Sequence, residues 1–167
     1  MRTLSSLINL LIAAALAAPL LPSCGGDDDP AEGEDVDAEG CEHLTEGPYT
    51  PVAAATDRSA AAPAVAADHQ AYSISLPAGA AGHVTFAADA AGDHVLFFDQ
   101  DVPVKVFSSS GVEEPIAASA SGSEACDQVK GRHTVALTVG THILEIGAAG
   151  SVSLVNLVIE EAGGHAD

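Results

Sequence analysis

Apolar and polar residues alternate through the stretch RHTVALTVGTHILEIG, residues 132–147, and this alternation decides the fold class. A period of two is typical of β-strands with one buried face. Gly140 and Thr141 divide the stretch, and a two-residue break that contains glycine is typical of a β-hairpin. We therefore predict a hairpin whose apolar face has His142 at its rim. The residues of that face are Val135, Leu137, Val139, His142, Leu144 and Ile146.

Similar short runs lie on both sides of this hairpin. Further strands are predicted within residues 71–76, 83–87, 93–99, 102–107 and 151–161. The run DHVLFFD, residues 93–99, is continuous, which is typical of a central strand buried on both faces. The last run changes phase near Leu154 and Val155, so we predict a β-bulge there. About eight short strands predict an all-β fold, an antiparallel β-sandwich of jelly-roll type, over residues 69–161.

Three of these runs resemble the bacterial pre-peptidase C-terminal type of β-sandwich domain. Its early strand has the form xYxIxL, as in residues 71–76, and its central strand contains FFD, as in residues 97–99. It closes with a GTYxLxV-like strand, matched by residues 140–146, in which His142 replaces the usual aromatic residue. The resemblance implies a sandwich fold by analogy, and a role as an accessory of secreted peptidases.

The N-terminal segment, residues 1–23, has the composition of an export signal. Arg2 is followed by fifteen mostly apolar residues, 7–21, which as a helix would cover roughly 22 Å. That length falls short of the ~30 Å hydrocarbon core and suits the apolar region of a secretory signal peptide.

Leu21-Pro22-Ser23-Cys24 resembles the lipobox of bacterial lipoproteins, with Pro22 departing from the commonest residue at its position. The resemblance implies that the Cys24 thiol carries diacylglycerol and that the new N-terminal amine is acylated after cleavage. These three acyl chains would anchor the protein stably to a membrane of the bacterial cell envelope, with the outer membrane favoured over the inner. The alternative is an ordinary signal peptide with a chance cysteine.

Residues 24–47 hold ten acids and neither Lys nor Arg. Mutual repulsion predicts an extended, solvated tether that holds the folded domain away from the lipid surface. A cation-collecting segment or an export signal remains an alternative. Residues 48–68 are rich in Ala and Pro and are predicted to be a linker, and residues 162–167 a flexible tail.

The whole chain of 167 residues is strongly acidic, with a formal net charge of −19 from 24 acids and five basic residues. Binding to nucleic acid needs clustered Lys and Arg that neutralise phosphates, so the sequence excludes that class of partner. An anionic lipid surface would also repel this protein.

Once Cys24 is assigned to lipid, Cys41 and Cys126 remain, an even number in an oxidising compartment. We predict a disulfide between them. It would close a loop of about 86 residues, for which the chain-entropy model gives about 4–5 kcal/mol of stabilisation. The alternative is a metal site at Cys41-Glu42-His43, although CxxC and HxxxH pairs are absent from the sequence.

Motifs of hydrolytic catalysis are absent from the sequence, which lacks GxSxG and leaves no cysteine free once these assignments are made. The chain is therefore not expected to be an enzyme, and no cofactor is expected. Asp99 and Asp101 follow a predicted strand and could offer oxygen ligands to Ca²⁺, the alternative being a solvated strand-to-turn junction. The predicted hairpin places His133 and His142 roughly 20 Å apart, too far to share an ion. The remaining histidines are His43, His69, His83, His94 and His165.

These observations favour a lipid-anchored envelope protein whose non-catalytic sandwich is displayed for contact with an envelope protein or a glycan. The first alternative is an envelope protein that binds a divalent metal ion such as Zn²⁺ or Cu²⁺ through His and carboxylate side chains. The second is the peptidase-accessory role that the resemblance implies.

Overall fold

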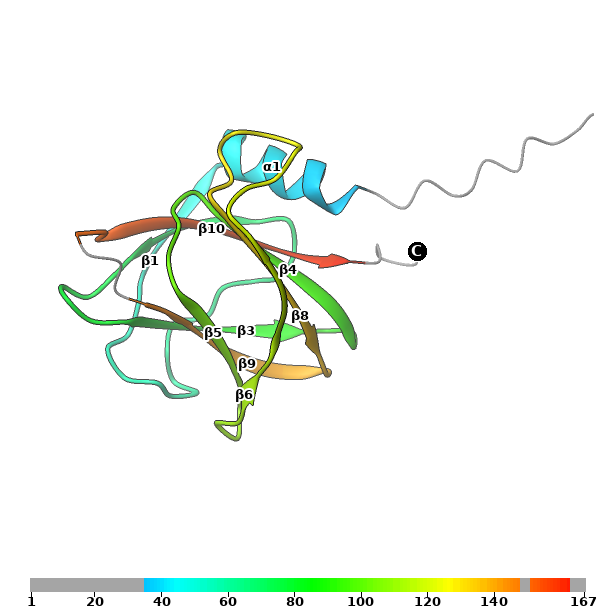
Figure 1. Ribbon diagram of the computed structural model, residues 1–167. Coiled ribbons are helices and arrows are strands. Elements are labelled where there is room, and N and C mark those ends of the chain that lie inside the picture. The colour runs from blue at the N-terminus through cyan, green and yellow to red at the C-terminus, as the bar shows by residue number, and fades with distance from the viewer. Residues whose placement is uncertain (1–34, 148–150, 163–167) are drawn as a thin grey trace, which may run out of the picture.

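The computed structural model describes residues 35–147 and 151–162, which form one helix and ten strands (Figure 1). The helix is α1, Val36–Glu46. The strands are β1 (Tyr49–Ala53), β2 (Ala71–Ser75), β3 (Gly82–Ala88), β4 (Gly92–Phe98), β5 (Val104–Ser108), β6 (Glu113–Glu114), β7 (Ile116–Ala120), β8 (Gly131–Leu137), β9 (Gly140–Ile146) and β10 (Leu154–Ala162).

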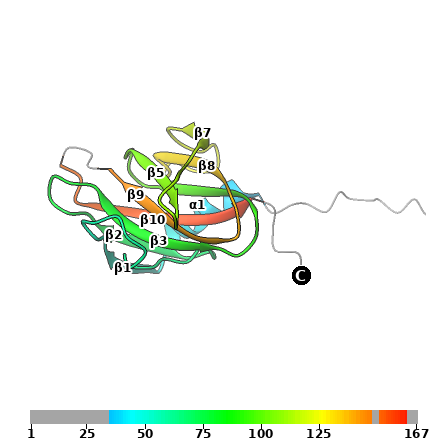
Figure 2. The same ribbon diagram turned by 90° about the horizontal axis from the view of Figure 1, so that it is seen from below.

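The strands form two sheets with a shared core, which confirms the predicted all-β sandwich (Figures 1 and 2). The larger sheet has the order β1-β2-β10-β4-β8-β7, and the smaller one β3-β9-β5-β6. Neighbours pair antiparallel except for β1 and β2, which are parallel. The last strand of the chain, β10, therefore lies inside the larger sheet, between β2 and β4.

Strand β4 is buried on both faces, as its continuous apolar run predicts. Leu96 and Phe98 belong to the core between the sheets. Val95 and Phe97 point to the opposite face, where they pack in a second cluster with Leu44 of α1. The six-stranded sheet is thus covered by the smaller sheet on one face and by α1 on the other.

The predicted hairpin over residues 132–147 is wrong in its pairing. β8 pairs with β4 and β7 in the larger sheet, whereas β9 pairs with β3 and β5 in the smaller one. The chain crosses between sheets at Gly140, whose φ of 140° favours glycine. The prediction of which residues point into the core is confirmed at four positions, Val135, Leu137, Leu144 and Ile146. The reason is that a period of two determines the face of a strand but not its partner strand. Val139 is 65% exposed at the crossing, and His142 is buried at 2% exposure instead of lying at a rim.

Residues 36–46, expected within the extended tether, form α1 instead. Asp35 caps this helix by accepting a hydrogen bond from the Asp37 backbone N–H. Asp37 and Glu39 stand in its first turn, where the helix dipole favours negative charge, so the acids that suggest a tether here suit a helix start.

The domain also begins earlier than predicted and has a more regular last strand. β1 lies within the expected linker and joins the sheet beside β2. The register of β10 runs without a break through Leu154 and Val155, so the predicted bulge is absent from this strand. The expected signal peptide, Cys24, the first part of the tether and most of the predicted tail lie outside the described residues. Among the residues described, none of the helices is long and apolar enough to span a bilayer.

Candidate metal centre

A cluster of imidazole and carboxylate groups lies where α1 meets the outer face of the six-stranded sheet. Glu39 and His43 are four residues apart on α1, which places them on one face of the helix. His69 stands just before β2 and has a φ of 50°, in the left-handed region. Glu160 lies on β10, opposite Val95 of β4.

The nitrogen Nδ1 of His69 lies at the centre of this cluster. It is 2.9 Å from Oε1 of Glu39 and 2.8 Å from Oε2 of Glu160. One ligand atom each from Glu39, His43 and His69 can be chosen so that all lie within 4.8 Å of one another. The rings of His43 and His69 have centroids 5.7 Å apart. Three potential ligands therefore lie close together, and Glu160 adjoins them through its contact with His69.

Glu160 is the unusual member, because its side chain is only 1% exposed. Burial raises the pKa of this carboxyl to about 7, since desolvation disfavours the charged form. The neighbouring His69 lowers the pKa, while the Glu39 charge raises it further. His69 is the hydrogen-bonding partner of this carboxyl, with Nδ1 2.8 Å from Oε2 of Glu160. A buried carboxylate in this setting is costly unless a cation compensates it.

The donor set fits a divalent transition metal ion. Two imidazoles with one or two carboxylates are typical ligands of Zn²⁺ and are also suited to Cu²⁺, whereas Ca²⁺ prefers oxygen ligands alone. Glu39 and His69 keep side-chain exposures of 26% and 32%. An ion could thus reach the cluster from solvent while Glu160 beside it stays buried.

Asp99 and Asp101, proposed from the sequence as calcium ligands, do not form a site in the described part of the chain. Both carboxylate oxygens of Asp99 accept hydrogen bonds from Asn156, one from the backbone N–H at 2.7 Å and one from the side-chain amide at 2.8 Å. Asp99 thereby ties the end of β4 to β10. Asp101 is exposed, and its charge partly offsets the lowering of the His133 pKa that desolvation causes.

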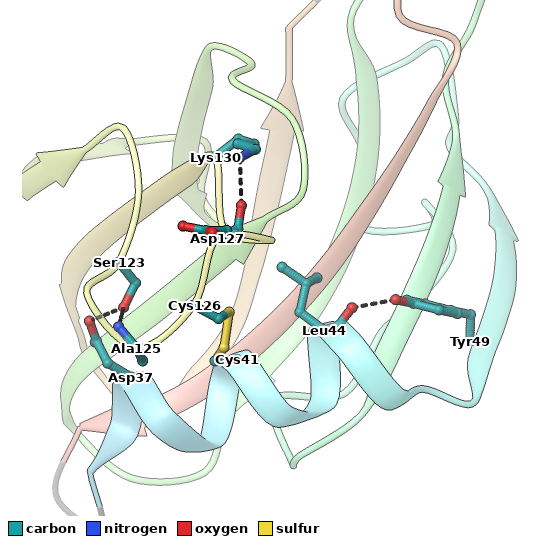
Figure 3. Close-up of a disulfide and its surroundings, with 9 residues drawn as sticks. All are labelled: Asp37, Cys41, Leu44, Tyr49, Ser123, Ala125, Cys126, Asp127 and Lys130. Atoms are coloured by element: carbon teal, nitrogen blue, oxygen red, sulfur yellow. Dashed lines mark hydrogen bonds between the residues drawn. A yellow bond between two sulfur atoms is a disulfide. The ribbon is translucent and has the colours of Figure 1, made fainter.

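The predicted disulfide between Cys41 and Cys126 is confirmed (Figure 3). Their Cα atoms are 6.0 Å apart, and the bond joins α1 to the loop between β7 and β8. The alternative of a cysteine-containing metal site at residues 41–43 is therefore wrong for Cys41. His43 of the same tripeptide does belong to the candidate centre.

The other described histidines each have partners elsewhere. His83 lies 3.2 Å from Glu145, and His94 lies 3.3 Å from Glu161. His133 contacts the Ser119 hydroxyl at 2.9 Å, and Nε2 of His142 lies 2.9 Å from the Thr138 carbonyl oxygen. His133 and His142 lie in different sheets, so they contribute to no common site, and His165 falls outside the described residues.

Sequence reasoning missed this centre for a specific reason. The spacing of Glu39 and His43 is that of one helix face, but the acids around it predict an extended segment. His69 and Glu160 have no local signal, because only the fold brings residues so distant in sequence next to the same helix.

No protein-family model matches the chain, and no curated protein matches it.

Proposed function

We propose that this protein binds a divalent transition metal ion at a site formed by Glu39, His43 and His69, with the buried Glu160 in contact with His69. The observation that carries the proposal is the convergence of two carboxylates on one imidazole nitrogen, both within 3 Å, with one of them buried. A cation in this cluster compensates both negative charges.

The position of the site favours reversible binding. Glu39 and His69 are partly exposed, so the ion can exchange with solvent without unfolding of the domain. Glu160 contacts His69 from the sheet side, while Glu39 and His43 approach from the helix. This arrangement suits a protein that stores a metal ion or hands it on, and it requires no chemistry at the metal.

Calorimetric titration of the full chain in detergent with Zn²⁺ tests this function. The acidic segment also attracts cations, so the informative quantity is the tightest equivalent of binding. We expect His69→Gln and His43→Gln each to weaken that equivalent by at least about 10- to 100-fold, because changing even an outer-shell partner of a ligand costs that much.

Asp101→Asn is the matched control, since it removes one exposed acid from the site proposed by sequence alone. It should leave the tightest equivalent unchanged. Equal affinity in the wild type, His43→Gln and His69→Gln would show that the cluster is not the site.

We further propose that the protein is exported and held at the cell envelope by lipid on Cys24. The lipobox-like Leu21–Cys24 supports the anchor, and the disulfide supports an oxidising compartment outside the cytoplasm. Mass spectrometry of the mature N-terminus should find acylated Cys24, and Cys24→Ala should move the protein from the membrane fraction to the soluble one. An unmodified thiol at this position would refute the anchor.

Display of the sandwich for contact with an envelope protein or a glycan is the competing function. It predicts that all variants of the metal cluster bind the partner as the wild type does. Absence of tight metal binding in the titration would favour display over metal binding. The peptidase-accessory role depends on the resemblance of the strand patterns alone.

A further inference from the structure

We infer that the Cys41–Cys126 disulfide regulates the proposed metal site by holding α1 in place. This inference rests on the proposed function and adds redox control to it. The link is α1, which carries Glu39 and His43 together with Cys41.

The metal ligands and the disulfide hold opposite flanks of the helix. Successive residues are about 100° apart around a helix, so Cys41 lies about 200° from Glu39, while His43 lies close to Glu39. Gly40 and Leu44 face the sheet between these flanks, and both are buried. The disulfide and the metal ligands therefore hold α1 from opposite sides of its contact with the six-stranded sheet.

The contact between α1 and the sheet is narrow and close. A Cβ atom placed on Gly40 would lie 2.4 Å from the Phe97 ring, so the helix backbone rests directly against β4. The buried residues of α1 are Gly40, Cys41 and Leu44. An isolated helix of 11 residues is marginal in water, so α1 depends on what fastens it to the sheet.

The side of α1 that carries Cys41 is also held by weaker, noncovalent contacts. Asp37 accepts hydrogen bonds from Arg132 and from the Ser123 hydroxyl, both at 2.8 Å. Figure 3 shows the one from Ser123. These side chains are only partly buried, so water competes for them. Among the contacts of this flank in the described residues, the disulfide is the covalent one, and thermal motion leaves it intact.

The redox step is thiol–disulfide exchange with a dithiol reductant. Cys126 is partly exposed and Cys41 is buried, so a reductant thiolate attacks Sγ of Cys126. Cys41 leaves as a thiolate and takes up a proton. The second thiol of the reductant then displaces Cys126 as a thiol, and the reductant becomes a disulfide.

Reduction lowers metal affinity because Glu39 and His43 stay in place only while α1 is docked. The apparent dissociation constant rises in inverse proportion to the docked fraction. Linkage makes the effect reciprocal, so a bound ion protects the disulfide from reduction by the same factor.

Zinc titration of the full chain in detergent measures the first effect. We compare the oxidised wild type with the double variant Cys41→Ser, Cys126→Ser, since new thiols would themselves bind Zn²⁺. The dissociation constant of the tightest equivalent should rise at least about tenfold in the double variant. The circular dichroism of the sheet should persist.

Protection of the disulfide in the unaltered cysteine pair measures the second effect. The protein is equilibrated in a buffer of reduced and oxidised glutathione with and without saturating Zn²⁺, and the reduced fraction is measured by mass spectrometry of labelled Cys41. Zn²⁺ should lower the labelled fraction in the wild type but not in His69→Gln.

The outcomes separate the two proposals. Equal zinc affinity in the wild type and the double variant, or equal labelling with and without Zn²⁺, overturns the redox control and leaves the metal site standing. Loss of the sheet signal in the double variant also overturns it, because the whole fold, not α1, would then depend on the bond. Absence of tight zinc binding in every form overturns the proposed function itself.

Discussion

At the scale of single residues, Glu160 shows how a site can oppose the stability of its own fold. The carboxyl is buried beside a second carboxylate, and burial raises its pKa to about 7. A folded-state pKa above the unfolded value means that the protonated form is favoured in the fold. The stabilisation from this group is therefore complete below about pH 4.5 and is lost as the pH rises through about 7.

Replacing Glu160 with Gln should change stability and metal binding in opposite directions. At pH 8 the metal-free variant should be more stable than the wild type by about 1–2 kcal/mol, because the buried charge is gone. The difference should shrink towards pH 5. Urea unfolding at both pH values, with a chelator present, measures it.

Zinc titration of the same variant should show weaker binding than in the wild type. Glu161→Gln is the control, since Glu161 neighbours Glu160 on β10 but pairs with His94. A Glu160→Gln variant with lower stability at pH 8 would contradict the sign of this prediction.

At the scale of elements, the position of α1 depends on Gly40, which has no side chain. Gly40 lets the helix backbone approach the Phe97 ring closely, and Phe97 is fully buried. Glycine in a helix interior usually costs stability relative to alanine, so its presence here reflects the contact with β4.

Gly40→Ala should therefore destabilise the domain, although alanine is the better helix former. Overpacking against a buried ring costs about 1–3 kcal/mol, which outweighs a gain of about 0.8–1 kcal/mol in helix propensity. Thermal unfolding measures the change, and zinc affinity should fall with it as α1 is displaced.

The double variant Gly40→Ala, Phe97→Leu provides the test of cause. Removing the ring makes room for the methyl group, so the second change should cost less in the Gly40→Ala background than in the wild type. Strict additivity of the two changes would contradict the proposed contact.

The elements also show what the sequence could determine. Alternation predicted which residues of β8 and β9 point inward, because that depends only on period two. It could not predict that these neighbours in sequence belong to different sheets, because pairing depends on distant strands. The helix α1 was missed because its acids are equally typical of a solvated chain and of a helix N-terminus.

At the scale of the whole molecule, the net charge of −19 works against compactness. Described ion pairs with Lys or Arg join Lys105 to Glu113 and Arg132 to Asp37, which offsets little of that charge. Self-repulsion of like charges destabilises a compact state and is screened by salt.

The melting temperature should therefore rise by roughly a few degrees when NaCl is increased from low concentration to about 0.5 M. Differential scanning calorimetry with a chelator present makes the measurement on the metal-free protein. KCl should give the same rise as NaCl, because screening depends on ionic strength and not on the cation. A fall in melting temperature would mean that attractive pairs dominate.

The sequence predicted those global features that depend on the number of residues or runs of one kind. Two cysteines left for an oxidising compartment predicted the disulfide, and repeated short alternating runs predicted the sandwich. The candidate site was not predictable, because Glu39, His69 and Glu160 are distant in sequence and have no common motif. Asp99 and Asp101 did carry a local signal, but Asp99 accepts hydrogen bonds from Asn156 instead of facing a common site with Asp101.

The placement of β10 has a consequence for how the polypeptide folds as it emerges during synthesis. Until residues 154–162 arrive, β2 and β4 lack the strand that lies between them, and the larger sheet stays split. The larger sheet can therefore complete its pairing only after β10 has emerged.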